Sequence, residues 1–299
     1  MMPRLQVEIH GDVPSGFRRE IEGELRECYR SLPASELQLV RICLFDTVER
    51  LREFKERERA QLGITTLGGE EFLATHDAWR GVPRITICLE RINQVPALVR
   101  RGAIRHEVAH SILHGSPAFY TFKLSRGLLA KGRERGLDVP AMQQLLYFVA
   151  ISVKDCEAVK LLLDHGYLDC QVALALYQMG AQEGATARPA QAGGQAPKRV
   201  DSMDRLAWLL ARSDPPLRLI FLAAQLKPLL FICPILKAHP DLRFLEWKAQ
   251  EMLSFLPAEE RERLWRIARK VASRIGEAGA SGETHRNVEM ALWLVLEEL

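Results

Sequence analysis

The sequence predicts an α+β protein, in which a small mixed sheet packs on helices and a mostly helical C-terminal region follows. Three observations support this fold class. Short β-rich runs alternate with segments of helical spacing in the first part of the chain. Two adjacent strands then precede a long helix. Beyond residue 115 the chain has mostly helical periodicity.

Each element of the first part follows from a local signal. Apolar and polar residues alternate over residues 5–9, which predicts a strand, and residues 17–32 have the spacing of a helix. Residues 37–45 are rich in β-forming side chains. Asp46 is a suitable N-cap for the charged helix that runs to about residue 61, and residues 63–69 are expected to form a loop.

A pair of strands leads into the next helix. The strands cover residues 72–79 and 84–89 on either side of a Gly-Val-Pro turn, and the second strand is rich in β-branched residues. The helix covers residues 96–114, and Gly115 can end it. The predicted order is therefore strand, helix, strand, helix, strand pair and helix.

The rest of the chain is predicted to be helical, with a linker in the middle. Helical spacing covers residues 142–165 and 169–178. Residues 184–197 consist mainly of Gly, Ala, Pro and Gln, a composition that cannot bury a core. The predicted parts are a metal-binding domain over residues 1–183, a flexible low-complexity linker over 184–199 and a helical C-terminal region over 200–299.

The composition argues against several classes of protein. The 41 basic and 38 acidic residues give a net charge of +3, and the arginine-rich stretches also contain acids, so no nucleic-acid partner is expected. The six cysteines form no C-x-x-C pair, which is typical of buried thiols in a reducing compartment. The first residues lack the apolar core of a secretory signal. We therefore expect a cytoplasmic protein.

An apolar stretch near residue 225 raises the question of a membrane span. Residues 217–236 are largely apolar, but Arg218, Lys227, Pro228 and Pro234 interrupt them. A spanning helix needs about 20 mostly apolar residues. A buried helical hairpin is therefore predicted, and no membrane contact is expected.

His106, Glu107 and His110 match the pattern H-E-x-x-H on the predicted helix. Residues four apart lie one above the other on a helix, so both imidazoles can point at one metal ion. Glu107 is adjacent and can reach a water on that metal, whose pKa zinc lowers to about 7. The pattern predicts one zinc ion per chain, two histidine ligands and a glutamate that activates water.

The phase of the helix favours a site on the histidine face. Ile104, Val108 and Ile112 form an apolar stripe. At 100° per residue, His106 and His110 lie about 200° and about 240° from Ile104. One side of the helix can therefore pack on the sheet while the histidines face a site. The alternative is that both histidines are hydrogen-bonded structural residues.

The third metal ligand is expected on the helix over residues 142–165. Asp155 shares a face with apolar residues, and a lone buried carboxylate needs a strong partner such as a metal ion. A buried pair with an Arg or Lys is the alternative for Asp155. Glu157 is the reserve ligand. It ranks below Asp155 because its neighbours Lys154 and Lys160 suggest that it lies in a solvated ladder of charges.

Four other side chains are weaker candidates. His114 lies about 12 Å along the helix from His106, which is too far for one zinc ion, so it is interpreted as a helix-end residue or a support for a ligand. Tyr120 could stabilise an oxyanion, although aromatic packing is favoured. His76 could face a cleft, although packing at the end of a strand is favoured. Trp79 is expected to cover the sheet.

The strand pair followed by His106, Glu107 and His110 resembles the zincin superfamily of metallopeptidases, and the resemblance covers roughly residues 5–167. It implies two histidine ligands, a general base at Glu107 and a third ligand from a later helix. It also implies that a strand before the motif helix, at residues 72–79 or 84–89, binds an extended peptide by β-augmentation.

The chain departs from the better-known zincin patterns. Leu113 and Ser116 occupy the positions at which metzincins carry Gly and His. Residues 123–132 contain no acid, whereas thermolysin-like members carry E-x-x-x-D in that region. The G-T-x-D pattern of aspzincins is also missing from the sequence. The chain therefore resembles a divergent, minimal zincin.

Three functions are compatible with these features. The first is a zinc-dependent hydrolase, a metallopeptidase acting on a peptide or protein substrate. The second is a non-catalytic zincin-like module that binds metal, a peptide or a protein. The third is a cytosolic regulator whose C-terminal helices bind a protein partner, since residues 200–299 carry no recognisable chemistry of their own.

Overall fold

The computed structural model describes residues 2–34, 36–63, 72–180, 199–275 and 283–299. It confirms the α+β class, with a mixed sheet, several helices around it and a helical C-terminal region. The chain forms two compact units. The first consists of Met1–Thr121 and Asp164–Leu174, and the second of Phe122–Leu163 and Ala175–Leu299.

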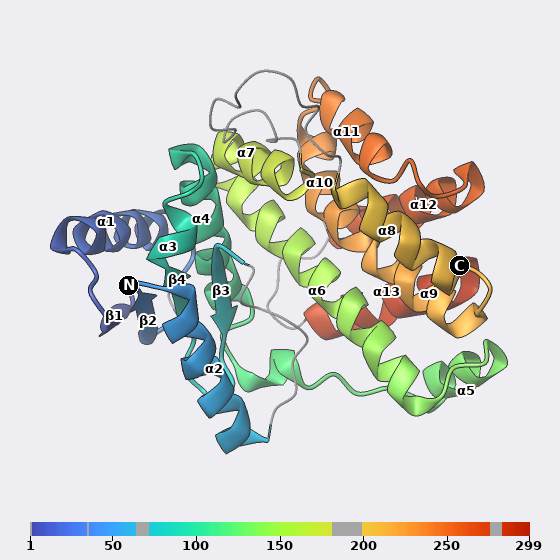
Figure 1. Cartoon of the computed structure of the whole chain (residues 1–299), viewed down its shortest axis with the longest axis horizontal. Coiled ribbons are helices and arrows are strands. Elements are labelled where there is room, and N and C mark those ends of the chain that lie inside the picture. The colour runs from blue at the N-terminus through green and yellow to red at the C-terminus, as the bar shows by residue number, and fades with distance from the viewer. Residues whose placement is uncertain (1, 35, 64–71, 181–198, 276–282) are drawn as a thin grey trace. The chain divides into compact units, whose positions relative to one another are not determined.

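The first unit contains the sheet and the helices beside it, drawn in blue and green in Figure 1. Its elements follow the predicted order, and a short helix and a 3-10 turn are additions to it. The strands are β1 (Arg4–His10), β2 (Leu39–Phe45), β3 (Ala74–Asp77) and β4 (Arg84–Cys88). The helical elements are α1 (Ser15–Ser31), α2 (Val48–Leu62), α3 (Leu89–Ile92), α4 (Ala97–Leu113), η1 (Pro117–Tyr120) and the first part of α7 (Leu168–Gln178).

The strands of the described sheet are ordered β1-β2-β4-β3. β1 pairs with β2 and β2 with β4 in parallel, whereas β3 is antiparallel to β4. The sheet is therefore mixed, as predicted, and β3 lies at one edge of it. Because side chains alternate along each strand, this register determines which residues share a face.

The two faces of the sheet have different chemistry. One face carries Ile42 and Ile85, both fully buried, and it is the face of His76, whose ring lies near α4. The other face carries Cys43 and Phe45, which pack in a cluster with residues of α2. This second face also carries several charged side chains.

A buried ion network joins α2 to the strands on this second face. Arg84 is only 4% exposed, and its guanidinium donates hydrogen bonds to both Glu58 and Asp77. Arg80 adds a second cation, 3.0 Å from Glu58 Oε1. Burial raises the pKa of Glu58, but the hydrogen bonds and charge of Arg84 outweigh burial and lower that pKa below its ordinary value. The network therefore depends on Arg84.

The start of α2 differs from the prediction by one residue. Thr47 is the N-cap, and its Oγ1 accepts a hydrogen bond from the amide of Arg50. Asp46 instead accepts hydrogen bonds from the amides of Asp12 and Thr47, at 2.9 and 2.8 Å. Both residue types can cap a helix, so the choice depends on the contact with Asp12, which is distant in sequence. The loop predicted over residues 63–69 lies outside the described residues except for Gly63, which ends α2 in a left-handed conformation.

The second unit is helical in its described residues. Its core is formed mainly by packing of α10 on α12 and of α12 on α13. The helices are α5 (Arg126–Glu134), α6 (Val139–Asp164), α8 (Arg199–Ala211), α9 (Pro215–Ala224), α10 (Leu226–Ala238), α11 (Phe244–Met252), α12 (Ala258–Ile275) and α13 (Thr284–Glu298).

The apolar stretch in this unit does not form the predicted hairpin. A single residue, Gln225, separates α9 from α10, and its helical backbone angles do not reverse the chain. The combined segment Pro215–Ala238 is long and apolar enough to cross a membrane by length and composition. Of its most apolar window, 67% is buried inside the structure, which is the pattern of a core helix in a soluble protein.

The units differ from the division predicted at residue 183. Most of α6 groups with the C-terminal helices. The physical reason is that α6 is apolar on several sides, and two of its acids, Asp155 and Glu157, have partners on α10 and α13. The predicted linker over residues 184–199 lies outside the described residues except for Arg199, the first residue of α8.

Replacement of Arg84 by Met should strongly destabilise the first unit. The substitution keeps most of the side-chain volume but leaves the Glu58 and Asp77 carboxylates buried without their main counter-charge, which typically costs about 3–5 kcal/mol. Urea unfolding followed by circular dichroism measures the loss. The matched control is Arg18→Met, which breaks an exposed pair with Glu22 and should change stability by no more than about 1 kcal/mol. Equal losses in both variants would contradict the assigned role of the network.

Candidate metal centre

The motif histidines lie on α4, as the sequence predicts. The helix begins after Pro96, which is its N-cap, and ends at His114, which is its C-cap. His106 is 5% exposed and His110 is 8% exposed. The predicted apolar stripe is also buried at Ile104 and Val108. Both sides of the helix are therefore covered, and the histidine side faces β3 through His76.

The geometry of the two rings fits a shared cation. Nε2 of His106 lies 3.0 Å from Nε2 of His110. Two imidazole nitrogens bound to one tetrahedral zinc ion, with Zn–N bonds of about 2.0–2.1 Å, lie roughly 3.3 Å apart. The same distance allows one N–H···N hydrogen bond, which is the metal-free alternative. The distance between the two nitrogens is therefore compatible with both arrangements.

His114 supports His110 from the end of the helix. It is fully buried, and its Nδ1 lies 3.0 Å from Nδ1 of His110. The ring of Phe119 packs edge-on against it at 5.4 Å. A histidine that binds a metal through one nitrogen commonly donates a hydrogen bond through the other, which fixes its orientation. The role of His114 as a support for a ligand stays a prediction, and this contact is the one through which it would act.

Tyr120 and His76 lie beside the motif helix. The hydroxyl of Tyr120 lies 3.0 Å from Nδ1 of His76. The ring of His76 is nearly parallel to that of His110, with centroids 6.2 Å apart. Trp79 packs edge-on against Tyr120. Sequence reasoning favoured plain packing for both Tyr120 and His76, but the structure gives the hydroxyl a specific polar partner beside the histidine pair.

The sequence contained a usable signal for His76. On a strand, every second residue shares a face, and the buried Ala74 and Ala78 flank His76 at this spacing. The pattern places His76 on the covered face of β3. It does not identify α4 as the cover, because that depends on the antiparallel register of β3 on β4.

The electrostatics keep Tyr120 protonated. Burial raises the pKa of the Tyr120 hydroxyl, and the negative charges of Asp77 and Glu107 raise it further. The phenol is therefore neutral and can donate a hydrogen bond at ordinary pH. The influence of Glu107 also shows that this half-buried carboxylate lies within electrostatic reach of the hydroxyl.

The predicted third ligand, Asp155, belongs to the second unit. It lies on α6, is 7% exposed, and shares its face with buried Ser152 and Val159, as expected. Nζ of Lys227 lies 3.6 Å from its Oδ2, so the alternative of a pair with a lysine has support as well. By residue type and burial, His106, His110 and Asp155 are each suited to bind a metal ion.

Glu157, the reserve ligand, has polar partners on another helix, which the sequence does not predict. Its Oε2 accepts a hydrogen bond of 2.8 Å from Thr284 Oγ1, and its Oε1 accepts one of 2.7 Å from Asn287 Nδ2. Both partners belong to α13. The carboxylate therefore contributes to helix packing in the second unit, and it does not belong to the metal-ligand group.

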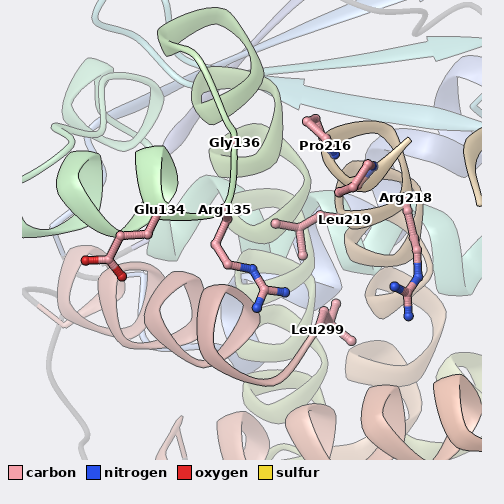
Figure 2. A pocket seen from close by; sticks show the side chains of 8 residues that line it. Glu134, Arg135, Gly136, Pro216, Arg218, Leu219 and Leu299 are labelled. Atoms are coloured by element: carbon pink, nitrogen blue, oxygen red, sulfur yellow. The ribbon is translucent and has the colours of Figure 1, made fainter. Parts of the chain in front are cut away.

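A hollow in the second unit offers no comparable chemistry. Figure 2 shows its lining, where Arg135, Leu219 and Leu299 project between α5, α9 and the end of α13. Arg218 also lines it, but this guanidinium forms an ion pair with Glu260. The lining has no histidine or cysteine, so the histidine pair on α4 remains the candidate centre.

Comparisons with protein-family models, with curated proteins and with solved structures found no match to this chain. The relation to zincins therefore stays a prediction that depends on the motif and on the geometry around it.

Replacement of His114 by Phe should weaken zinc binding without removing a predicted ligand. The ring volume is kept, but His110 loses the hydrogen-bond partner of its Nδ1, a change that typically costs about 10–100-fold in metal affinity. Competition with a chelating dye measures the affinity. As a packing control, Phe119→Leu alters the contact on the same ring and should leave affinity within a few-fold of the wild type. Unchanged affinity in His114→Phe would show that His114 does not orient a ligand.

Proposed function

We propose that the chain is a zinc-dependent hydrolase of the zincin type, a metallopeptidase that acts on peptide or protein substrates. The observation that carries this proposal is the placement of two buried imidazole nitrogens 3.0 Å apart on the helix that also carries Glu107. A structural pair of histidines does not require an adjacent glutamate. A hydrolytic site requires both.

In this proposal His106, His110 and Asp155 hold one zinc ion. Two imidazoles and one carboxylate are a usual ligand set for a catalytic zinc that keeps a fourth position open. Bound zinc would lower the pKa of a water to about 7 and polarise the substrate carbonyl. Burial of the three side chains supports their assignment, because zinc would give each of them a strong partner away from bulk water.

The remaining roles fall to residues of the first unit. Glu107 accepts the proton of the attacking water and returns it to the leaving amine. Tyr120 remains protonated, so its hydroxyl can donate a hydrogen bond to the carbonyl oxygen as negative charge develops there. His76 orients that hydroxyl through their 3.0 Å contact. His114 holds the ring of His110.

The sheet suggests where an extended substrate would bind. β4 is paired with β2 on one side and with β3 on the other, so it has no edge left for a peptide. Within the described sheet β3 is an edge strand, and it contacts α4. Of the two strands considered from the sequence, β3 is therefore the one we assign to β-augmentation.

A cytoplasmic location is part of the proposal. All six cysteines are free and buried, as expected for thiols in a reducing compartment.

Glu107→Gln should abolish hydrolysis while zinc stays bound. The amide keeps the shape of the side chain but cannot accept a proton, and general-base catalysis typically contributes about 10²–10⁴-fold. Initial rates on a mixture of unstructured peptides, together with metal analysis of the same samples, test both statements. The wild-type rate should also be lost on treatment with a chelator.

The control is Glu22→Gln on α1, which changes a partly exposed glutamate in the same unit and should leave the rate unchanged. If Glu107→Gln cleaved peptides at the wild-type rate, the mechanism would be wrong. Zinc binding without hydrolysis in the wild type would favour the non-catalytic module.

Asp155→Asn should weaken zinc binding by more than the roughly 10–100-fold that is typical of an outer partner, because it removes the charge of a ligand. Glu157→Gln is the matched control on the same helix and should leave zinc affinity unchanged, since its carboxylate binds α13. Calorimetric or dye-competition titration measures both. Wild-type affinity in Asp155→Asn, or an equal loss in the control, contradicts the assignment of Asp155.

The non-catalytic module remains the second candidate because of one contact. Lys227 gives Asp155 a partner that needs no metal ion. Lys227→Met distinguishes the two roles. If Asp155 binds zinc, removal of the competing ammonium should raise zinc affinity; if Asp155 only pairs with Lys227, the variant should lose stability with no change in zinc affinity.

A further inference from the structure

A second group of metal-ligating side chains lies on the α2 face of the sheet. Glu8 and His10 are two residues apart on β1, so they project to the same side. Cys43 is the direct partner of Glu8 on β2 and projects to that side too. The carboxylate oxygen, imidazole nitrogen and thiol sulfur all lie within 4.8 Å of one another.

We propose that Glu8, His10 and Cys43 form a second zinc site, independent of the histidine pair on α4. All three side chains belong to the first unit and to neighbouring parallel strands. The site would join the edge strand β1 to β2. It lies on the opposite face of the sheet from His76, and it needs no residue of the proposed hydrolytic centre.

The donor set selects the kind of cation. A thiolate, an imidazole and a carboxylate together suit a borderline-soft ion such as Zn²⁺ and do not suit Mg²⁺ or Ca²⁺, which prefer oxygen ligands. In a tetrahedral zinc site the ligand atoms lie roughly 3.3–3.8 Å apart, given bonds of about 2.0–2.3 Å. The three groups therefore have to approach by at most about 1–1.5 Å, which small side-chain rotations can provide.

The ligands are already restrained. The ring of His10 stacks on Phe45 at 4.3 Å with an interplanar angle of 6°, and Phe54 packs on it at 5.0 Å. Cys43, on β2, is fully buried. Nε2 of His10 is buried and has no hydrogen-bond partner among the described residues. A buried imidazole nitrogen without a partner has lost its hydrogen bond to water and gained none in the protein. A bound cation would replace that lost interaction.

The positive charge of Arg41 beside Glu8 is the strongest argument against a cation at this site, but the geometry of the ion pair permits one. Its Nε and Nη2 donate hydrogen bonds of 2.9 Å to the two oxygens of Glu8. Each carboxylate oxygen has two lone pairs. The second lone pair of Oε1 accepts a hydrogen bond of 3.4 Å from Gln6, and that of Oε2 accepts one from the Cys43 thiol, so Oε2 is the oxygen that becomes open when the thiol loses its proton. Arg41 would then hold the carboxylate in place for the metal, as outer partners of ligands commonly do.

Metal binding displaces the thiol proton of Cys43. In the protein alone, Sγ of Cys43 donates a weak hydrogen bond to Oε2 of Glu8 at 3.8 Å. On binding, the S–H bond breaks and its proton passes to solvent. The zinc ion takes the place of that proton between Sγ of Cys43 and the carboxylate of Glu8, and a sulfur–zinc bond forms. Two negative ligands then face a doubly charged cation, and no oxidant or reductant is required.

Cobalt provides a test that separates this site from the proposed hydrolytic one. Co²⁺ bound to a thiolate gives a sulfur-to-metal charge-transfer absorption in the near ultraviolet, and a site of two histidines and an aspartate contains no sulfur. We expect the full-length metal-free protein, titrated with Co²⁺ without oxygen, to develop this band with one equivalent. Zinc should displace the cobalt and shift the thermal unfolding midpoint upward.

Cys43→Ser should abolish the band, and Cys88→Ser, which changes a second buried thiol of the same core cluster, should keep it. His10→Gln on the half-buried edge strand is the second variant, and it should weaken cobalt binding at least tenfold even if Cys43→Ser does not fold. A folded wild type without the band, or a band that survives His10→Gln at full affinity, would overturn the proposal. His106→Ala should leave the band intact whatever the fate of the hydrolytic centre.

Discussion

The packing of α4 is the constraint on which the rest of the candidate centre depends. On one side, the hydroxyls of Tyr29 in α1 and Ser111 in α4 share a buried hydrogen bond of 2.6 Å. On another, α4 approaches α7 so closely that a Cβ on Gly102 would lie 2.3 Å from the carbonyl oxygen of Cys170. Only glycine permits this approach. The helix is therefore fixed in position and rotation, and with it the directions of the motif histidines.

The sheet divides its two covered faces between different kinds of interaction. The face towards α4 buries apolar side chains such as Ile42 and Ile85 beside His76, whereas the face towards α2 buries Arg84 with its two acids and holds the pair of Glu8 and Arg41. Since a slip of one residue would exchange the faces of a strand, these ion pairs penalise a wrong register more strongly than apolar contacts alone. A fixed register is what brings His76 of β3 to α4 and Glu8 opposite Cys43.

Local signals were sufficient to predict the strands and the longer helices of the first unit, and contacts between distant residues explain much of what was missed. The motif helix and the order of strands follow from periodicity, which the chain carries within short segments. Asp46 was assigned as an N-cap because the contact with Asp12 across 34 residues is not visible in a local pattern. The hydrogen bonds of Glu157 are not visible in a local pattern for the same reason, since its partners Thr284 and Asn287 lie in the last helix. The hydrogen bond between Tyr120 and His76 also depends on the register of β3, which composition does not encode.

His106 and His110 could bind a metal without becoming charged, with His114 as the hydrogen-bond partner of His110. Nε2 of His106 faces Nε2 of His110, and Nδ1 of His110 faces Nδ1 of His114, so the rings form a chain of two contacts at 3.0 Å. In a neutral imidazole one nitrogen donates and the other accepts. If His106 and His110 both carry their protons on Nδ1, their Nε2 lone pairs are available to one cation, and His110 donates its proton to Nδ1 of His114. Without a cation, the His106–His110 contact instead needs a proton on one Nε2. Metal binding then requires only a change of tautomer, which avoids the free energy of burying an imidazolium, and His114 is the residue that accepts the resulting hydrogen bond.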